Sequence, residues 1–117
     1  MLVDAQNVRR STWPNIAPEE LVELVGRWTR AEGMHAVVVF DGRAPTLDVG
    51  EAPVELVSTG SESADDWIAR EAATFRKRDT PFWLITSDRE LRERASAGAT
   101  RTVGGGSFAR RLLELRS

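Results

Sequence analysis

Short apolar runs alternate along the chain with amphipathic segments of helical period. Continuous runs rich in Val, Ile, Leu and Phe are typical of strands that are covered on both faces of a sheet. Five strands are expected, at residues 1–3, 35–40, 54–59, 82–86 and 100–103. In the segments between them, apolar residues recur with the spacing of a helix, which predicts repeated strand–helix units.

The boundaries of the expected helices are marked by local signals. Residues 18–32 place apolar side chains on one face, with Pro18 suited to the first turn and Gly33 to the C-terminal cap. Ser63 is expected to cap the next helix, with Asp66 three residues later as in a capping box. These signals predict where helices begin and end, but not which face of a sheet they cover.

The end of the chain has its own pattern. Residues 88–98 predict a short helix closed by Gly98, and glycines 104–106 are expected to form a flexible link to a last helix capped by Ser107. Strands that alternate with helices predict an α/β fold with a mainly parallel sheet of about five strands and helices on both faces. At 117 residues, the chain is expected to form a single domain.

The amino-acid composition limits the class of protein and the kinds of catalytic or metal-binding site that the chain can form. Apolar residues make up 41% and charged residues 29%, which is typical of a globular protein, and no run is long enough to span a bilayer. We therefore expect a cytoplasmic protein that does not enter a membrane. The absence of Cys leaves oxygen ligands for any metal, and the single His35 makes a serine-type catalytic triad a poor hypothesis.

Three apolar runs end in a carboxylate: Asp4, Asp41 and Asp88. Because the carboxyl ends of parallel strands share one edge of a sheet, these acids are expected to lie close together, where ligands bind in such folds. Asp65 opens the helix after the third strand and is expected at the same edge. Clustered carboxylates repel one another, and a hard cation such as Mg²⁺ offsets that repulsion.

Each polar residue also has a purely structural interpretation. Asp88 could cap a helix, and Asp65 and Asp66 could occupy a first turn because the helix dipole favours anions there. Asp41 before a glycine is a turn signal, and Asn7 could form an Asx turn. These local rules do not explain why the acids share one edge.

Net charge is −2, which argues against a uniformly basic nucleic-acid binder. Fifteen of the sixteen basic residues are Arg, which binds phosphate in a bidentate way, although charge runs are usually solvated helix faces. Of the four tryptophans, three fall at core-like positions. Trp13, in a loop, could contact a ligand or could equally cover the core.

Four segments, "VDAQNV", "VVVFDG", "SADDWI" and "LITSDREL", follow in this order along the chain. Together they resemble the NYN domains of the PIN-like nuclease superfamily, and are most similar to the YacP-like branch, described as predicted RNA-binding or endoribonuclease proteins. The segment "AGATRTVGGGSFARRL" is similar to the end of that domain. The resemblance implies a three-layer α/β/α fold over residues 1–117 and metal-dependent cleavage of RNA.

Carried over by position, the resemblance implies a set of site residues. The catalytic residues would be Asp4, Asp65 and Asp88, which would bind Mg²⁺ or Mn²⁺ together with Asp41. Residues expected to contact the substrate or to support the metal ligands are Asn7, Asp66, Thr86, Ser87, Arg9, Arg10 and Arg43.

Three functions are compatible with these observations. We favour a metal-dependent endoribonuclease acting on RNA, for instance mRNA or tRNA in a ribosomal context, because an acidic cluster has little use in a domain that only binds an anion. The alternative is a non-catalytic RNA- or ribosome-binding module on the same fold. In a third hypothesis the domain binds other proteins and the acids are only caps.

Overall fold

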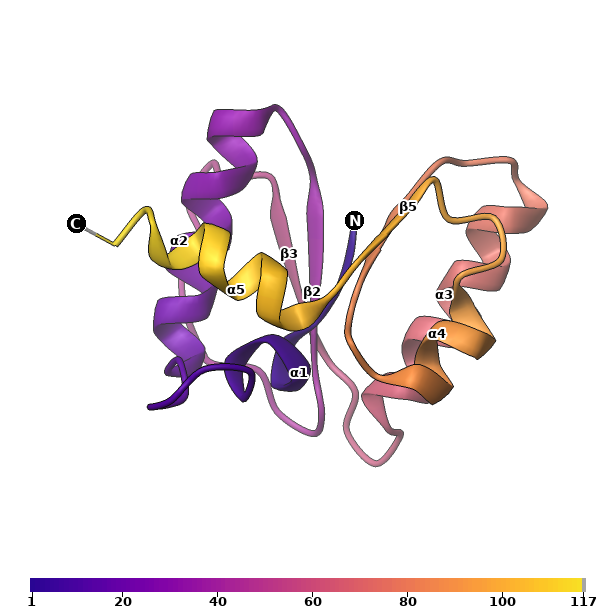
Figure 1. Ribbon diagram of the computed structural model, residues 1–117, viewed down its shortest axis with the longest axis horizontal. Coiled ribbons are helices and arrows are strands. Elements are labelled where there is room, and N and C mark those ends of the chain that lie inside the picture. Colours follow the sequence, from indigo (N-terminus) through magenta and orange to yellow (C-terminus); the bar gives the residue numbers. More distant parts are fainter. Residues whose placement is uncertain (117) are drawn as a thin grey trace.

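The computed structural model describes residues 1–116 as a five-stranded sheet between two layers of helices (Figure 1). The strands are β1 (Leu2–Asp4), β2 (Ala36–Phe40), β3 (Val54–Ser58), β4 (Trp83–Ile85) and β5 (Arg101–Val103). The helices are α1 (Ala5–Arg9), α2 (Pro18–Glu32), α3 (Ala64–Lys77), α4 (Arg89–Ala95) and α5 (Gly105–Leu113). The predicted α/β architecture is confirmed, and no strand begins or ends more than one residue from its expected position.

The sheet is parallel throughout, with the strand order β3-β2-β1-β4-β5. In the central register, Val3 of β1 lies between Val38 of β2 and Ile85 of β4. The chain adds β2 and β3 on one side of β1, then crosses over to add β4 and β5 on the other. Strand order therefore reverses between β1 and β4, and a parallel sheet opens a crevice for ligands at such a point.

Side chains of the central strands alternate between two cores. Val3 and Ile85 contribute to the core beneath α1, α2 and α5, whereas Leu2 and Leu84 contribute to the core beneath α3 and α4. All four of these side chains are completely buried. This two-sided burial explains why the strands appear in the sequence as continuous apolar runs rather than as an alternating pattern.

Local capping signals hold for α2 and for the start of α3. Ser63 Oγ accepts a hydrogen bond from the backbone N–H of Asp66 at 3.0 Å, so α3 begins as expected. Pro18 lies in the first turn of α2, and Gly33 ends this helix in the left-handed conformation, with φ of 65°. Within residues 1–116, no helix is both long and apolar enough to cross a bilayer.

Helix α1 was not expected. Asp4 is both the last residue of β1 and the N-cap of α1, since its Oδ1 accepts a hydrogen bond from the N–H of Asn7 at 3.4 Å. The chain therefore passes from strand to helix without a loop. A helix of five residues is too short to show a periodic pattern, which is why the sequence did not reveal it.

The glycines at 104–106 were wrongly expected to be a flexible link. Gly104 is the N-cap of α5, the helix begins at Gly105, and Ser107 lies within it rather than capping it. Glycine is needed at 105 because a Cβ there would lie 2.1 Å from Oδ1 of Asn7. The missing side chain lets the start of α5 pack directly against α1. Likewise, α4 ends at Ala95, short of the expected Gly98.

Replacing Gly105 with Ala should destabilise the fold, because the new methyl group and the Asn7 side chain cannot both keep their positions. We expect Gly105→Ala to lower the free energy of unfolding by about 1–3 kcal/mol, the usual cost of overpacking a buried contact. Urea denaturation followed by circular dichroism would measure the difference.

Gly106→Ala is the matched control, one residue further along the same helix. A Cβ at 106 would meet Arg110 Nη1 at 3.7 Å and Ser11 Cβ at 3.9 Å, which are ordinary contacts. Because Ala is favoured over Gly inside a helix by about 0.5–1 kcal/mol, this variant should be as stable as the wild type or more stable. Equal stability of the two variants would show that the packing of α5 on α1 does not require Gly105.

Candidate functional site

An open, polar cleft of about 340 Å³ lies at the carboxyl edge of the sheet. Its lining consists of Asp4, Gln6, Asn7, Arg10, Ser11, Asp41, Asp65, Ser87 and Asp88. These residues come from the ends of β1, β2 and β4, from α1 and from the first turn of α3. In Figure 1 this edge faces downward, where α1, α3 and α4 begin. The cleft thus includes the point between β1 and β4 where strand order reverses.

The structure brings together most of the residues that the sequence singled out. The seven of them that line the cleft are Asp4, Asn7, Arg10, Asp41, Asp65, Ser87 and Asp88. Gln6 and Ser11 also line it and were not predicted. They lie in α1 and just after it, and the sequence could not orient a helix that it did not reveal.

Thr86 lies beneath the cleft and connects two of its acids. Its side chain is completely buried, and Oγ1 donates a hydrogen bond to Asp4 Oδ2 at 3.0 Å. The same Oγ1 accepts from the backbone N–H of Asp88 at 3.1 Å. Thr86 therefore orients the Asp4 carboxylate and fixes the start of the Asp88 turn, without lining the cleft itself.

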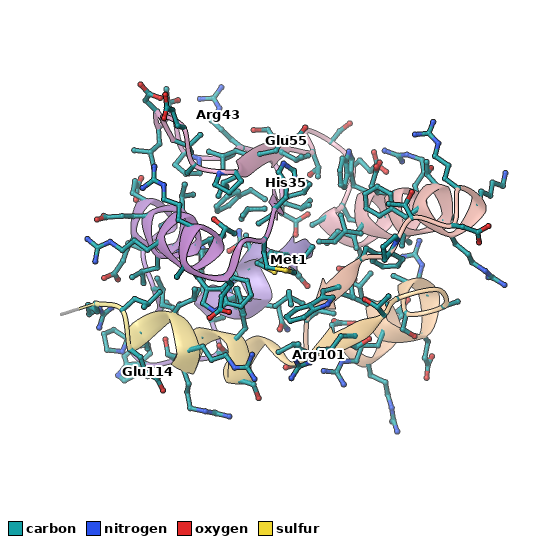
Figure 2. The ribbon with its side chains drawn as sticks, turned by 90° about the horizontal axis from the view of Figure 1, so that it is seen from above. Met1, His35, Arg43, Glu55, Arg101 and Glu114 are labelled. Atoms are coloured by element: carbon teal, nitrogen blue, oxygen red, sulfur yellow. The ribbon has the colours of Figure 1, made fainter. Side chains whose placement is uncertain are left out.

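Three further predicted residues lie outside the cleft. Arg9 donates a hydrogen bond from Nε to the carbonyl oxygen of Ile16 at 2.7 Å. Its side chain therefore binds the loop after α1. Asp66 accepts a hydrogen bond from Arg94 at 2.8 Å on the outer surface of α3 and α4. Arg43 is exposed in the loop after β2, near the β3 side of the sheet (Figure 2).

Asn7 joins three elements rather than forming a local Asx turn. Its Oδ1 accepts a hydrogen bond from the backbone N–H of Ser87 at 2.8 Å, across 80 positions of the sequence. Ser87 Oγ in turn accepts from the backbone N–H of Gly105 at 2.8 Å. These bonds tie α1 to the turn after β4 and to the start of α5, and thereby fix the wall of the cleft that carries Ser87 and Asp88.

Two further acids act as helix caps, which the structural interpretation had proposed for Asp88 but not for Asp41. Asp41 Oδ1 accepts from the N–H of Ala64 at 2.7 Å, and Asp88 Oδ1 accepts from the N–H of Leu91 at 2.9 Å. Asp41 therefore caps a helix that begins 23 positions later. Capping and lining the cleft are compatible, because capping occupies Oδ1 while the carboxylate as a whole still faces the shared space.

The cleft carries negative charge that its own side chains do not balance. Asp4 is only 6% exposed, and burial raises its pKa to about 6 although hydrogen bonds from Thr86 and Asn7 favour the ionised form. The charges of Asp65 and Asp88 raise the pKa of Asp4 further.

A second carboxyl group shows the same repulsion. Burial raises the pKa of Asp65, and the charges of Asp88 and Asp41 add to this effect, while Arg94 opposes it. Carboxylates from distant parts of the chain are therefore close enough to disfavour the ionisation of Asp4 and Asp65.

The donor set suits a hard divalent cation, which prefers carboxylate oxygens and offsets their repulsion. In residues 1–116, however, no three acidic or histidine side chains lie close enough together to enclose an ion. Mg²⁺ often binds through one or two carboxylates and completes its shell with water and substrate phosphate. The residues present fit that open mode of binding rather than a closed cage.

Comparisons with known proteins agree with this arrangement. A parallel α/β sheet with carboxylates at its reversal point defines a class of proteins that bind ligands at the strand ends. Residues 2–116 match the YacP-like NYN domain family, and the chain belongs to that family. The NYN domain places it in the PIN-like nuclease superfamily and indicates a nuclease or RNA-related function.

Two solved structures share the fold. The crystal structure of Rae1 (YacP) from Bacillus subtilis superposes with a TM-score of 0.73 at 22% identity, covering 98% of this chain and 74% of that one. A tryptophan-to-leucine mutant of the same protein gives a TM-score of 0.73 at 19% identity, covering 98% and 75%. At such identities the likeness establishes the fold alone. A comparison with curated proteins gives no significant match.

The raised pKa of Asp4 predicts a specific dependence of stability on pH. Between about pH 4 and about pH 6, the unfolded chain loses the Asp4 proton first, so the folded state becomes less favoured as pH rises. Above about pH 6 the full penalty is present. Asp4→Asn should therefore increase the free energy of unfolding by about 1–3 kcal/mol near pH 7.5 in the presence of a chelator, and this gain should vanish towards pH 4.

Thermal melts of both proteins across this pH range would test the prediction. Asp48→Asn is the control, since Asp48 is exposed outside the cleft and Asn can still accept the hydrogen bond from Gly50. This variant makes the same change of charge away from the cleft. A gain for Asp4→Asn that depends on pH no more than the effect of the control would show that Asp4 carries no burial penalty.

Proposed function

We propose that this protein is a Mg²⁺- or Mn²⁺-dependent endoribonuclease that hydrolyses RNA phosphodiester bonds in the acidic cleft. The observation that carries the proposal is the uncompensated charge of the cleft, where Asp65 and Asp88 oppose the ionisation of buried Asp4. Such an arrangement costs stability in the isolated protein, and a cation removes that cost. Membership of the YacP-like NYN family supports RNA as the substrate.

Asp4, Asp65 and Asp88 are the residues from which the one or two direct carboxylate ligands of the cation would come, with Asp41 beside them. When bound, the cation would lower the pKa of a water molecule and offset negative charge on the phosphodiester. Because no three of the acids enclose an ion, water and RNA phosphate oxygens would complete its coordination. Affinity for the metal should accordingly rise when RNA is present.

Other residues in and beneath the cleft would orient the acids and position the substrate relative to them. Thr86 keeps Asp4 in one orientation by a hydrogen bond at 3.0 Å, which limits the rotamers it can sample. Asn7 fixes the backbone at Ser87, one residue before Asp88, by a hydrogen bond at 2.8 Å. Arg10, on the cleft wall, is the side chain suited to contact a phosphate.

One observation favours a second function. The lack of a closed three-ligand group within residues 1–116 is what a non-catalytic RNA-binding module on this fold would also show. Such a module should bind RNA equally well with or without divalent cations, and loss of an acid should leave binding unchanged or strengthen it, because repulsion of phosphate would fall.

Adjacent residues Asp65 and Asp66 offer a matched test of the enzyme proposal. Asp65 lines the cleft, whereas Asp66 pairs with Arg94 outside it. With labelled single-stranded RNA and Mg²⁺ or Mn²⁺, Asp65→Asn should reduce the cleavage rate by about 100-fold or more, and Asp66→Asn should cleave at close to the wild-type rate. Chelation should abolish cleavage by all three proteins.

Calorimetric titration with Mn²⁺ would show whether any loss of activity arises at the metal. Binding to the wild type and to Asp66→Asn, but not to Asp65→Asn, is the expected result. Wild-type activity of Asp65→Asn, or cleavage that persists in chelator, would overturn the proposal. RNA binding without cleavage in any of the proteins would favour the binding module.

A further inference from the structure

Trp13 is the most exposed large apolar side chain in the described part of the chain, at 91%. The other three tryptophans are at least half covered: Trp28 is buried, and Trp67 and Trp83 pack against the two cores. The possibility that Trp13 covers the core is therefore excluded. The Trp13 indole therefore lies almost entirely in water, without the burial that normally stabilises a tryptophan side chain.

The loop that carries Trp13 is anchored at both ends. Arg9 and Ile16 exchange two hydrogen bonds, from Arg9 Nε to the Ile16 carbonyl at 2.7 Å and from the Ile16 N–H to the Arg9 carbonyl at 3.1 Å. Ile16 is also buried in the core. Within the loop, Thr12 Oγ1 donates to the carbonyl oxygen of Pro14 at 3.3 Å, which spans Trp13 itself. The indole is thus presented on a closed, braced loop.

This loop adjoins the acidic cleft. Arg10 and Ser11, its first residues, line the cleft, and Trp13 follows two positions after Ser11. Two residues of chain span at most about 7 Å, so the backbone of Trp13 lies beside the rim of the site. Ser11 is held in place because both its N–H and its Oγ donate to the carbonyl oxygen of Val8. In Figure 1 the loop runs from α1 toward the lower left, along the same lower edge at which α3 and α4 begin farther to the right.

We propose that Trp13 is a binding residue that stacks on an unpaired RNA base next to the phosphate held in the cleft. The inference rests on the proposed function, and it specifies the substrate as single-stranded at that position. Bases in a duplex are already stacked and paired, whereas a splayed base offers a free face to an aromatic ring. Stacking is also a form of attraction that the negative charge of the cleft does not oppose.

Arg10 complements this role from the same loop. Arg10 lines the cleft, where its guanidinium would be suited to the backbone phosphate, while Trp13 would take the base. The two side chains together would fix one nucleotide relative to the acids, with little dependence on base identity, because every base has a face that stacks.

The test compares RNA binding by Trp13→Ala, Trp13→Phe and Leu47→Ala in the full chain. Fluorescence anisotropy would be measured with a labelled single-stranded RNA and with a matched duplex, in Ca²⁺ to limit cleavage. Leu47 is the control because it is 40% exposed, is apolar and lies outside the cleft. Since Trp13 makes little contact with the fold, both Trp13 variants should melt at the wild-type temperature.

Trp13→Ala should bind the single strand about tenfold or more weakly, Trp13→Phe should retain most of the affinity, and Leu47→Ala should match the wild type. Binding to the duplex should not change. A single-stranded RNA with one 2-aminopurine should be quenched on binding to the wild type, and this quenching should be lost in Trp13→Ala.

Two results would overturn the inference, and they are distinguishable from each other. If the wild type binds and cleaves the single strand and Trp13→Ala does so equally well, the enzyme proposal stands, and Trp13 contacts something other than RNA, such as a protein surface. If the wild type neither binds nor cleaves RNA, the proposed function fails along with the role of Trp13.

Discussion

The hydrogen bond from Thr86 to Asp4 joins the ends of β1 and β4, the two strands between which the order of the sheet reverses. Asp4 is the last residue of β1 and the N-cap of α1, and it also lines the cleft. The same residue therefore belongs to the sheet, to a helix end and to the candidate site. Burial disfavours its ionisation, and the charges of Asp65 and Asp88 add to that effect. The fold therefore keeps at its centre a group that is costly when charged, which is typical of a functional site rather than of a core.

The surroundings of this group are connected by hydrogen bonds between segments that are distant in the sequence. The bonds from Ser87 to Asn7 and from Gly105 to Ser87 connect α1, the turn after β4 and α5. On the other side of α1, paired bonds between Arg9 and Ile16 close the loop that presents Trp13. The acids and the loop are thus braced through the same short helix. Under the proposed function, such bracing would hold a substrate strand at a fixed distance from the carboxylates, which hydrolysis requires.

The sequence alone was sufficient for the architecture. Continuous apolar runs and intervening helical periodicity gave the strands, four of the five helices and the parallel sheet. Ser63 and Gly33 marked helix ends correctly, because capping depends on residues within a few positions of each other. The gathering of Asp4, Asp41, Asp65 and Asp88 also followed from the chain order, since parallel strands place all their carboxyl ends at one edge.

Only the tertiary structure decided which polar side chains face the cleft and which serve the fold. Local rules treat the neighbours Asp65 and Asp66 alike, yet one lines the cleft and the other pairs with Arg94. Local rules also predicted a flexible link at the glycines before Ser107. In the structure these glycines begin α5, and Gly105 allows this helix to contact Asn7. Periodicity and capping are properties of a short stretch of chain, and the sequence determined them. The direction of a side chain depends on packing between segments that lie far apart in the sequence, so it appears only once the chain has folded.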